Sequence, residues 1–187
     1  MENKFSRPDP SKGPSDWDYA EAPWRQGRGS TYRFMLLSWF GCGLSPKAPG
    51  TVGSLGALPL GVAIQLFYGQ AALGICAVAL FFAGWAVARV HFGSDDNVKD
   101  PQWVVVDEAV GLWIAMAAMP LSFYSVPLAF GLFRLFDIKK PWPVSWADRS
   151  VGGALGIMLD DLLAGLYAAI GGISAIAAFR AIWAGVQ

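Results

Sequence analysis

Five apolar runs separated by short polar segments constrain this chain more than any other feature. They cover 55–67, 71–90, 103–119, 126–136 and 162–184. About 20 apolar residues cross a bilayer as a helix, so 71–90 and 162–184 qualify and 55–67 is marginal. The runs 103–119 and 126–136 are short, which leaves them tilted, partly re-entrant or buried inside a bundle. We therefore expect an all-α, membrane-associated helical bundle.

Composition supports the membrane interpretation. Hydrophobic residues make up 55% of the 187 residues and charged residues only 15%, against roughly 25% charged in soluble domains. The charges gather in 1–33, 89–108 and 134–161. A small soluble helical protein with a very apolar core can look similar, but charge placement favours a membrane protein. The formal net charge is zero, so nothing indicates a nucleic-acid partner.

The first 33 residues differ from the rest of the chain. They are polar, rich in Pro and Gly, and lack the apolar core of a signal peptide. We interpret 1–33 as a flexible cytoplasmic arm, because it cannot bury enough surface to order itself, and 34–187 as one helical domain. A short helix is expected over Thr31–Phe40, and Cys42 and Cys76 are expected to remain reduced thiols because they lack metal-ligand spacing.

The apolar runs predict a common side for the charged loops. Runs 55–67 and 71–90 form one expected hairpin, and 103–119 and 126–136 form another, each with a short uncharged tip. The charged loops that return to one side are 41–54, 91–108 and 137–161. They carry Lys47, Arg89, Lys99, Lys139, Lys140 and Arg149. The positive-inside rule makes this side cytoplasmic.

Two adjacent carboxylate pairs mark the candidate site. Asp107-Glu108 interrupts one apolar run, and Asp160-Asp161 directly precedes the last. An unpaired charge at membrane depth costs at least ~2.5–3.5 kcal/mol, so such acids are typically functional. The alternative for the first pair is a helix end whose acids touch water or favour the helix dipole.

Glycines accompany both carboxylate pairs. Gly111 follows Glu108 by three positions and Gly165 follows Asp161 by four, so each glycine shares a helical face with an acid and allows the two helices to approach. Converging carboxylates of this kind suit Mg²⁺.

Basic residues follow on the same expected side. Arg134 and Asp137 are three residues apart, which fits a structural ion pair or, alternatively, a phosphate-binding guanidinium beside a metal-binding carboxylate. Lys140 lies before Pro141 and is expected in a loop over 139–150. Asp148-Arg149 follow in that loop.

The segment Pro49-Gly-Thr-Val-Gly-Ser54 precedes an apolar helix. Hydroxyls of Thr51 and Ser54 and backbone amides at a helix start can cradle a phosphate. The same residues are also ordinary turn and cap chemistry.

The chain lacks the residues that several phosphatase and nucleotide-binding mechanisms require. His91 is the only histidine, neither cysteine is followed six residues later by Arg, and no P-loop or Gly-x-Ser-x-Gly elbow occurs. Carboxylates, a metal, Arg and Lys remain, which favours metal-assisted attack of water or of an aspartate on phosphorus.

Taken together, the motifs resemble the phosphatidylglycerophosphatase A family, from about Leu36 to the last helix. The motifs that carry the resemblance are Leu44-Ser-Pro46 with Pro49–Ser54, Val106-Asp-Glu108 with Gly111, Phe133-Arg-Leu-Phe-Asp137 with Lys140-Pro-Trp-Pro143, Asp148-Arg149, and Gly156-Ile-Met-Leu-Asp-Asp161 with Ala164-Gly165. The resemblance implies a helical bundle with a central helix. It also implies Mg²⁺-dependent hydrolysis of phosphatidylglycerophosphate to phosphatidylglycerol and phosphate in the bacterial inner membrane.

The resemblance implies site residues as well. Catalytic or metal-binding positions are Asp107, Glu108, Asp137, Asp160 and Asp161, with Asp107, Glu108, Asp160 and Asp161 as the metal set; phosphate contacts are Arg134, Lys140 and Arg149. Which carboxylate acts as base or nucleophile stays open. The competing interpretation is a small transporter or ion-conducting bundle with buried carboxylates. The sequence does not indicate an oligomeric state.

Overall fold

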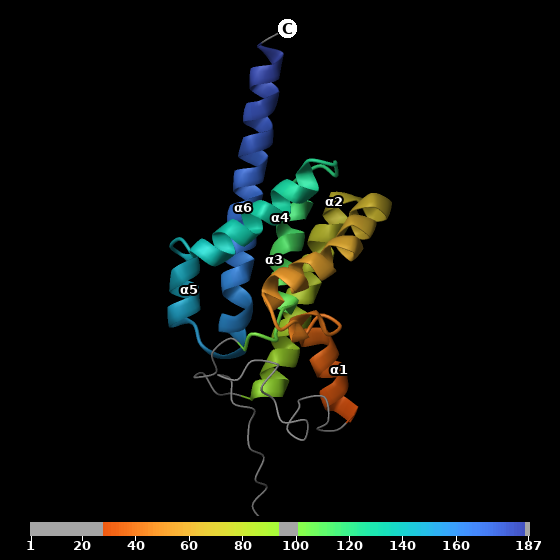
Figure 1. The fold of residues 1–187 in the computed structure, drawn as a ribbon, viewed down its shortest axis with the longest axis vertical. Helices are drawn as coiled ribbons and strands as arrows, with labels where there is room; N and C mark the ends of the chain where they lie inside the picture. Colours follow the sequence, from red (N-terminus) through yellow and green to blue (C-terminus); the bar gives the residue numbers. More distant parts are fainter. Residues whose placement is uncertain (1–27, 94–100, 186–187) are drawn as a thin grey trace, which may run out of the picture.

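The computed structural model describes residues 28–93 and 101–185, and within these residues the chain is helical, without a strand. The elements are α1 (Arg28–Leu37), the 3-10 helix η3 (Cys42–Leu44), α2 (Pro49–Phe92), α3 (Val106–Ala117), α4 (Ser125–Lys139), α5 (Val144–Ser150) and α6 (Gly153–Ala184). Figure 1 shows them as one bundle from which the C-terminal half of α6 projects. The all-α prediction is confirmed.

Helix α3 lies at the centre of the bundle, between α2, α4 and α6. Nine of its twelve residues are buried. Twelve helical residues rise roughly 18 Å, too little for a bilayer core of roughly 30 Å. Of the possibilities left open for 103–119, the structure therefore has a helix buried inside the bundle, and the expected central helix is confirmed.

Residues 103–105 are not helical, although the apolar run predicted a helix from Trp103. Val105 N–H donates to the carbonyl oxygen of Leu37 (2.9 Å), and the Trp103 ring packs on Phe34 with centroids 5.2 Å apart. These contacts with α1 and its C-terminal end hold the segment outside the helix. As a result α3 begins at Val106, and the Asp107-Glu108 pair lies in its first turn.

The first predicted hairpin is present within α2. Gly69 has non-helical dihedral angles (φ 86°, ψ 175°), and Figure 1 shows the chain turning back there. A positive φ of this kind is readily adopted by glycine alone. Pro59 lies inside the first arm and does not end it.

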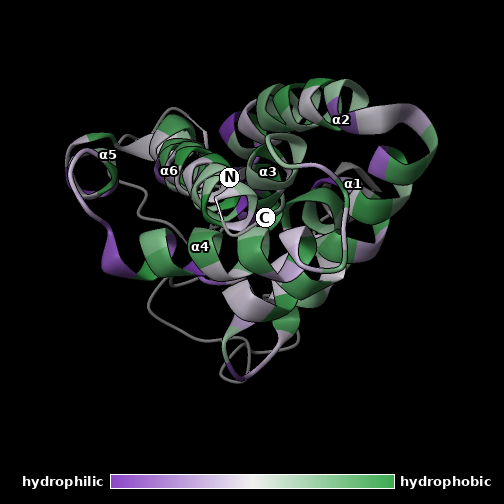
Figure 2. Ribbon diagram, turned by 90° about the horizontal axis from the view of Figure 1, so that it is seen from above, coloured by the Kyte–Doolittle hydropathy of each residue, from purple (hydrophilic) through white to green (hydrophobic). Residues whose placement is uncertain are grey.

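Helices α2 and α6 are long and apolar enough to cross a membrane by length and composition. Hydrophobic colouring predominates along both in Figure 2. Large apolar side chains point outward from them, including Leu60, Leu66, Phe67, Ile75, Phe82, Ile170, Ile173 and Phe179. Exposed apolar surface on this scale suits contact with lipid rather than water.

Two predicted loops contain helices, and those predictions were wrong. Segment 41–54 includes η3 and the first six residues of α2, which starts at Pro49. Proline suits a first helical position because its missing N–H has no partner there anyway. Segment 139–150 includes α5, whose buried Val144 and Ala147 pack it onto the bundle. Short helices of this kind depend on tertiary contacts that composition does not reveal.

The bounds of two other elements differ from expectation. Helix α6 begins at Gly153 rather than residue 162, so both aspartates of the second pair lie within it. Helix α1 begins at Arg28, inside the predicted arm 1–33, and residues 1–27 of that arm lie outside the described residues. The division at residue 33 stays a prediction.

A buried amide joins α2 to the end of α3. Gln65 is 5% exposed, and its Nε2 donates to the carbonyl oxygen of Met119 (2.8 Å). We expect Gln65→Leu to lower the free energy of unfolding by about 1–3 kcal/mol, because that carbonyl oxygen would lose its side-chain donor. Thermal unfolding in detergent would measure it. Gln70→Leu is the control, since Gln70 is exposed and its contact is long (3.4 Å); an equal loss in both variants would contradict the prediction.

Candidate functional site

The site forms where α3, α4 and α6 meet beside the start of α2. The first turn of α3 supplies Asp107 and Glu108, and α6 supplies Asp160 and Asp161 two turns after its start. The C-terminal end of α4 supplies Arg134 and Asp137. These positions are far apart in sequence, and the bundle brings them together as the charge pattern predicted.

Two glycines set the distance between the acid-bearing helices. A Cβ on Gly165 would overlap the backbone of Gly111, and a Cβ on Gly111 would overlap the carbonyl oxygen of Asp161. The helices therefore touch backbone to backbone at this crossing, as small residues allow. This contact confirms the prediction made from the spacing of the glycines to the acids.

The Glu108 side chain packs against the first turns of α2. A Cβ on Gly50 or Gly53 would overlap its carboxylate, so only glycine leaves room there. One oxygen, Oε1, lies 3.5 Å from Nη1 of Arg134, whereas Oε2 is buried without a hydrogen-bond partner among the described residues. Burial raises the pKa of Glu108 to about 8, although Arg134 favours the charged form.

Arg134 bridges two carboxylates. Its Nη1 lies 2.7 Å from Oδ2 of Asp137, one turn along α4, in addition to its contact with Glu108. Both members of the Arg134–Asp137 pair are only 16% exposed. The guanidinium Nε is buried without a hydrogen-bond partner in the part of the chain described. The predicted ion pair is present, and it lies among the acids rather than on an isolated helix face.

Lys140 forms a second bridge. It caps α4 in a left-handed conformation (φ 43°), and its Nζ donates to Asp148 and to Oδ2 of Asp160 (2.9 Å). Burial disfavours the ammonium form, but hydrogen bonds to Asp148 and Asp160 outweigh it and hold the pKa of Lys140 above its ordinary value. The second basic residue is thus also bound to a carboxylate of the cluster.

Asp161 and Asp107 are the most buried acids of the group, at 4% and 2% exposure. Asp161 is close enough to interact electrostatically with Asp107, Glu108, Asp137 and Asp160. Oδ1 of Asp107 accepts a hydrogen bond from the backbone N–H of Glu108 (2.9 Å) at the positive end of α3. Five carboxylates therefore converge on one region.

Three residues predicted to contact phosphate are not joined to the carboxylate cluster by an ion pair or hydrogen bond among the described residues. Ser54 is buried, and its hydroxyl donates to the carbonyl oxygen of Gly50 (2.9 Å). Thr51 is half-buried in the first turn of α2. Arg149 is exposed at the end of α5 and forms no ion pair within the described residues. Their roles stay predictions.

Three contacts of the site were not predicted from the sequence: Gly50 and Gly53 lie beside Glu108, and Asp148 is a partner of Lys140. The i,i+3 spacing of the two glycines at a helix start was the available signal for the first. The contact between Lys140 and Asp148 depends on how α5 folds back, which the sequence did not indicate.

The donor set fits a hard divalent cation. All candidate ligands are carboxylate oxygens, which Mg²⁺ prefers, and Oε2 of Glu108 is buried without a partner among the described residues. In the present arrangement no three His, Cys, Asp or Glu side chains of the described residues are grouped to hold an ion, and Arg134 and Lys140 neutralise the acids instead. The carboxylates that could hold such an ion are Glu108, Asp161, Asp107 and Asp160, which interact electrostatically around Asp161.

Comparison with known proteins identifies the family of such a site. The sequence model of phosphatidylglycerophosphatase A matches residues 35–176, which include all five carboxylates, Arg134 and Lys140. No solved structure matches this chain.

Three curated relatives were found. Phosphatidylglycerophosphatase A of Escherichia coli K12 is 38% identical over 141 residues, 72% of this chain and 78% of the relative. The protein of the same name from Haemophilus influenzae is 40% identical over 137 residues, 73% of this chain and 83% of its own. A putative phosphatidylinositol-3-phosphatase of Bacteroides thetaiotaomicron is 42% identical over 146 residues, 73% of this chain and 88% of its own.

Proposed function

This chain belongs to the phosphatidylglycerophosphatase A family, and from that premise we propose that it removes the terminal phosphate of phosphatidylglycerophosphate in a Mg²⁺-dependent reaction. The products are phosphatidylglycerol and inorganic phosphate. Family membership favours this phosphatase over a cation-conducting bundle, although buried carboxylates alone suit both.

One observation carries the proposal: two basic side chains are held directly on a cluster of buried carboxylates. Arg134 contacts Glu108 and Asp137, and Lys140 contacts Asp160. A phosphate monoester needs both kinds of group, since carboxylates hold the cation and basic donors hold the phosphate oxygens. An ion pathway has no need of two cations fixed among its acids.

Each residue type has a distinct task in this proposal. Glu108 and Asp161 would hold Mg²⁺, which would supply positive charge beside the phosphate and make water a stronger nucleophile at neutral pH. Arg134 offers a planar pair of N–H donors to phosphate oxygens, and Lys140 a compact charge, so together they stabilise the charge of the transition state. A carboxylate near them accepts a proton from the attacking water, or attacks phosphorus itself to form an acyl phosphate that water then hydrolyses. In both cases the P–O bond to the lipid breaks, and the leaving phosphatidylglycerol oxygen takes up a proton.

The proposed setting is the bacterial inner membrane, with the site facing the cytoplasm. Bacterial relatives and the two long apolar helices support a membrane protein. The orientation rests on the basic residues gathered at the site end of the bundle and on the positive-inside rule. The lipid headgroup would then reach the carboxylates from the membrane surface.

Gly50 offers a test of how Glu108 is positioned. We expect Gly50→Ala to reduce phosphate release by about tenfold or more, because the added methyl would displace the Glu108 carboxylate, and a small misplacement of a catalytic group has large effects. Gly74→Ala is the control, since the nearest atom to its Cβ would lie at 3.8 Å. Equal activity in both variants would show that Glu108 does not need this position.

The substrate is tested by phosphate release from three lipids in matched detergent micelles: phosphatidylglycerophosphate, phosphatidic acid and phosphatidylinositol 3-phosphate. We expect the fastest release from the first. A preference for phosphatidylinositol 3-phosphate would instead indicate the activity named for the Bacteroides relative. If folded protein released phosphate from none of the three lipids, the ion-conducting bundle would become the favoured interpretation.

A further inference from the structure

A cavity lies at the end of the bundle away from the carboxylates. It has a volume of about 560 Å³ and opens between the α3–α4 connection, α4 and the C-terminal half of α6. Pockets that take small molecules have volumes of about 300–1,000 Å³. Its α6 residues, Ala175 to Arg180, lie 14 or more positions beyond Asp161, which is roughly 20 Å or more along the helix. It is therefore separate from the candidate active site.

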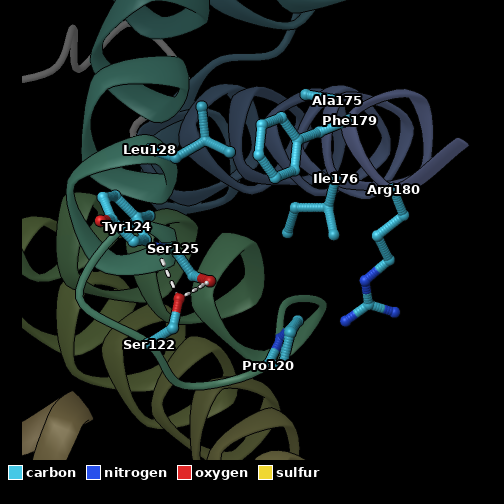
Figure 3. Close-up of a pocket in the computed structure, with 9 residues that line it drawn as sticks. All are labelled: Pro120, Ser122, Tyr124, Ser125, Leu128, Ala175, Ile176, Phe179 and Arg180. Carbon is cyan, nitrogen blue, oxygen red and sulfur yellow. Dashed lines mark hydrogen bonds between the residues drawn. The ribbon is translucent and has the colours of Figure 1, made fainter. Parts of the chain in front are cut away.

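The cavity is apolar with a cation at its edge. Figure 3 shows Leu128, Ile176 and Phe179 around its centre, and the guanidinium of Arg180 on the side of Pro120. Ser122 and Ser125 add hydroxyls that hydrogen-bond to each other (2.6 Å). A lining of this kind suits a long apolar chain attached to a polar, negatively charged group.

Arg180 has no carboxylate to pair with on the stretches of chain that line the cavity. The stretches 109–136 and 162–187 contain no Asp or Glu, and Arg180 is the only charged residue after Asp161. Within the residues that the structure describes, no ion pair forms at Arg180, and its side chain is exposed. A guanidinium placed there is a bidentate donor that lacks an acceptor, and phosphate is the acceptor that it fits best.

The position of Arg180 along α6 agrees with a membrane surface. Twenty residues separate it from Asp160, a helical rise of roughly 30 Å, which equals the hydrocarbon thickness of a bilayer. With the carboxylates at one surface, Arg180 reaches the level of the headgroups at the other. The family match ends at residue 176, before Phe179 and Arg180, so this feature is not part of what identifies the family.

We propose that this cavity binds an anionic glycerophospholipid of the opposite leaflet, with one acyl chain against Leu128, Ile176 and Phe179 and the phosphate on Arg180. The lipid would be held by the unpaired positive charge of Arg180 beside an apolar cavity. This proposed site is therefore independent of the substrate that binds at the carboxylates. If Arg180 only extended its side chain to the membrane surface, the lipid contact would depend on its charge alone. Binding of a lipid in the cavity depends on the shape of the cavity as well.

The test is photocrosslinking in nanodiscs of phosphatidylcholine that contain a phosphatidylglycerol with a diazirine in its acyl chain. Crosslinks are mapped by peptide mass spectrometry, which separates the cavity peptides, 120–128 and 175–183, from peptides of the active site. We expect crosslinks on the cavity peptides, competed away by unlabelled phosphatidylglycerol roughly tenfold better than by phosphatidylcholine of the same chains.

Three variants distinguish lipid binding in the cavity from a general attraction of lipid to a positive charge. Arg180→Gln should weaken the crosslink roughly tenfold by removing the phosphate donor, and Ala175→Phe should do so by filling the cavity while keeping Arg180. Arg89→Gln is the matched control, an exposed arginine that does not line the cavity. Unchanged crosslinking in Ala175→Phe, or equal competition by the two lipids, would overturn the proposal.

Discussion

Replacing Glu108 by Gln or Asp161 by Asn should abolish phosphate release, with a loss of about 10³-fold or more in turnover. Each variant keeps the shape of the side chain and removes one negative oxygen ligand from the buried cluster. Loss of a single group that stabilises transition-state charge costs about 10²–10³ in rate, and loss of a metal ligand adds to this.

Stability should not fall with activity in the Glu108 variant. Burial raises the pKa of Glu108 to about 8, which means that the charged carboxylate is costly in the folded protein. A neutral amide avoids that cost, so Glu108→Gln should melt at the same temperature or higher. This combination of lost activity and kept stability is typical of a functional residue.

Asp148→Asn serves as the graded control for both variants. Asp148 also contacts Lys140, but it is more exposed, and Asp160 would still hold that lysine. We expect a loss below about tenfold, as for a surface ion pair. Activity in Glu108→Gln and Asp161→Asn equal to that of Asp148→Asn would contradict the assignment of the buried cluster.

The second large effect is expected at the crossing of α3 and α6. Gly165→Ala would place a methyl group in the backbone of Gly111, with no flexible side chain to move aside. We expect the free energy of unfolding to fall by at least about 2 kcal/mol, and phosphate release to be lost as the carboxylates of the two helices separate. Thermal unfolding in detergent and the phosphate assay measure the two effects.

Gly131→Ala provides the matched control on α4. Nothing lies within 4 Å of a Cβ at this exposed helical position. Alanine should therefore stabilise the protein by about 0.4–1 kcal/mol, because it reduces the freedom of the unfolded chain. If Gly165→Ala were as stable as Gly131→Ala, the close backbone contact would not exist in solution.

The sequence was sufficient to predict structure where a residue type can be accommodated in only one way. Apolar runs became helices, and the Gly111 and Gly165 spacings predicted a close crossing that the structure has. The charge pattern placed Glu108, Arg134 and Asp161 at one end of the bundle, because acids and bases that are costly in an apolar setting must gather.

The sequence was insufficient where contacts between distant segments determine the local backbone or the partner of a side chain. Residues 103–105 are apolar and β-branched or aromatic, and the hydrogen bond from Val105 to Leu37 together with the packing of Trp103 on Phe34 keeps them out of α3. Because α2 starts at Pro49, the Ser54 hydroxyl lies inside the helix and donates to the Gly50 carbonyl oxygen, a contact that the turn-like sequence did not indicate; its predicted phosphate contact stays a prediction. The contact of Lys140 with Asp160 likewise depends on how α4 and α6 pack.

The central claim is that buried carboxylates hold a divalent cation and thereby remove phosphate from a lipid. Its most direct test is phosphate release from phosphatidylglycerophosphate by the wild type and by Glu108→Gln, each measured with Mg²⁺ and with excess chelator. We expect release only from the wild type with Mg²⁺. Release that persists in chelator, or in Glu108→Gln with Mg²⁺, would contradict it.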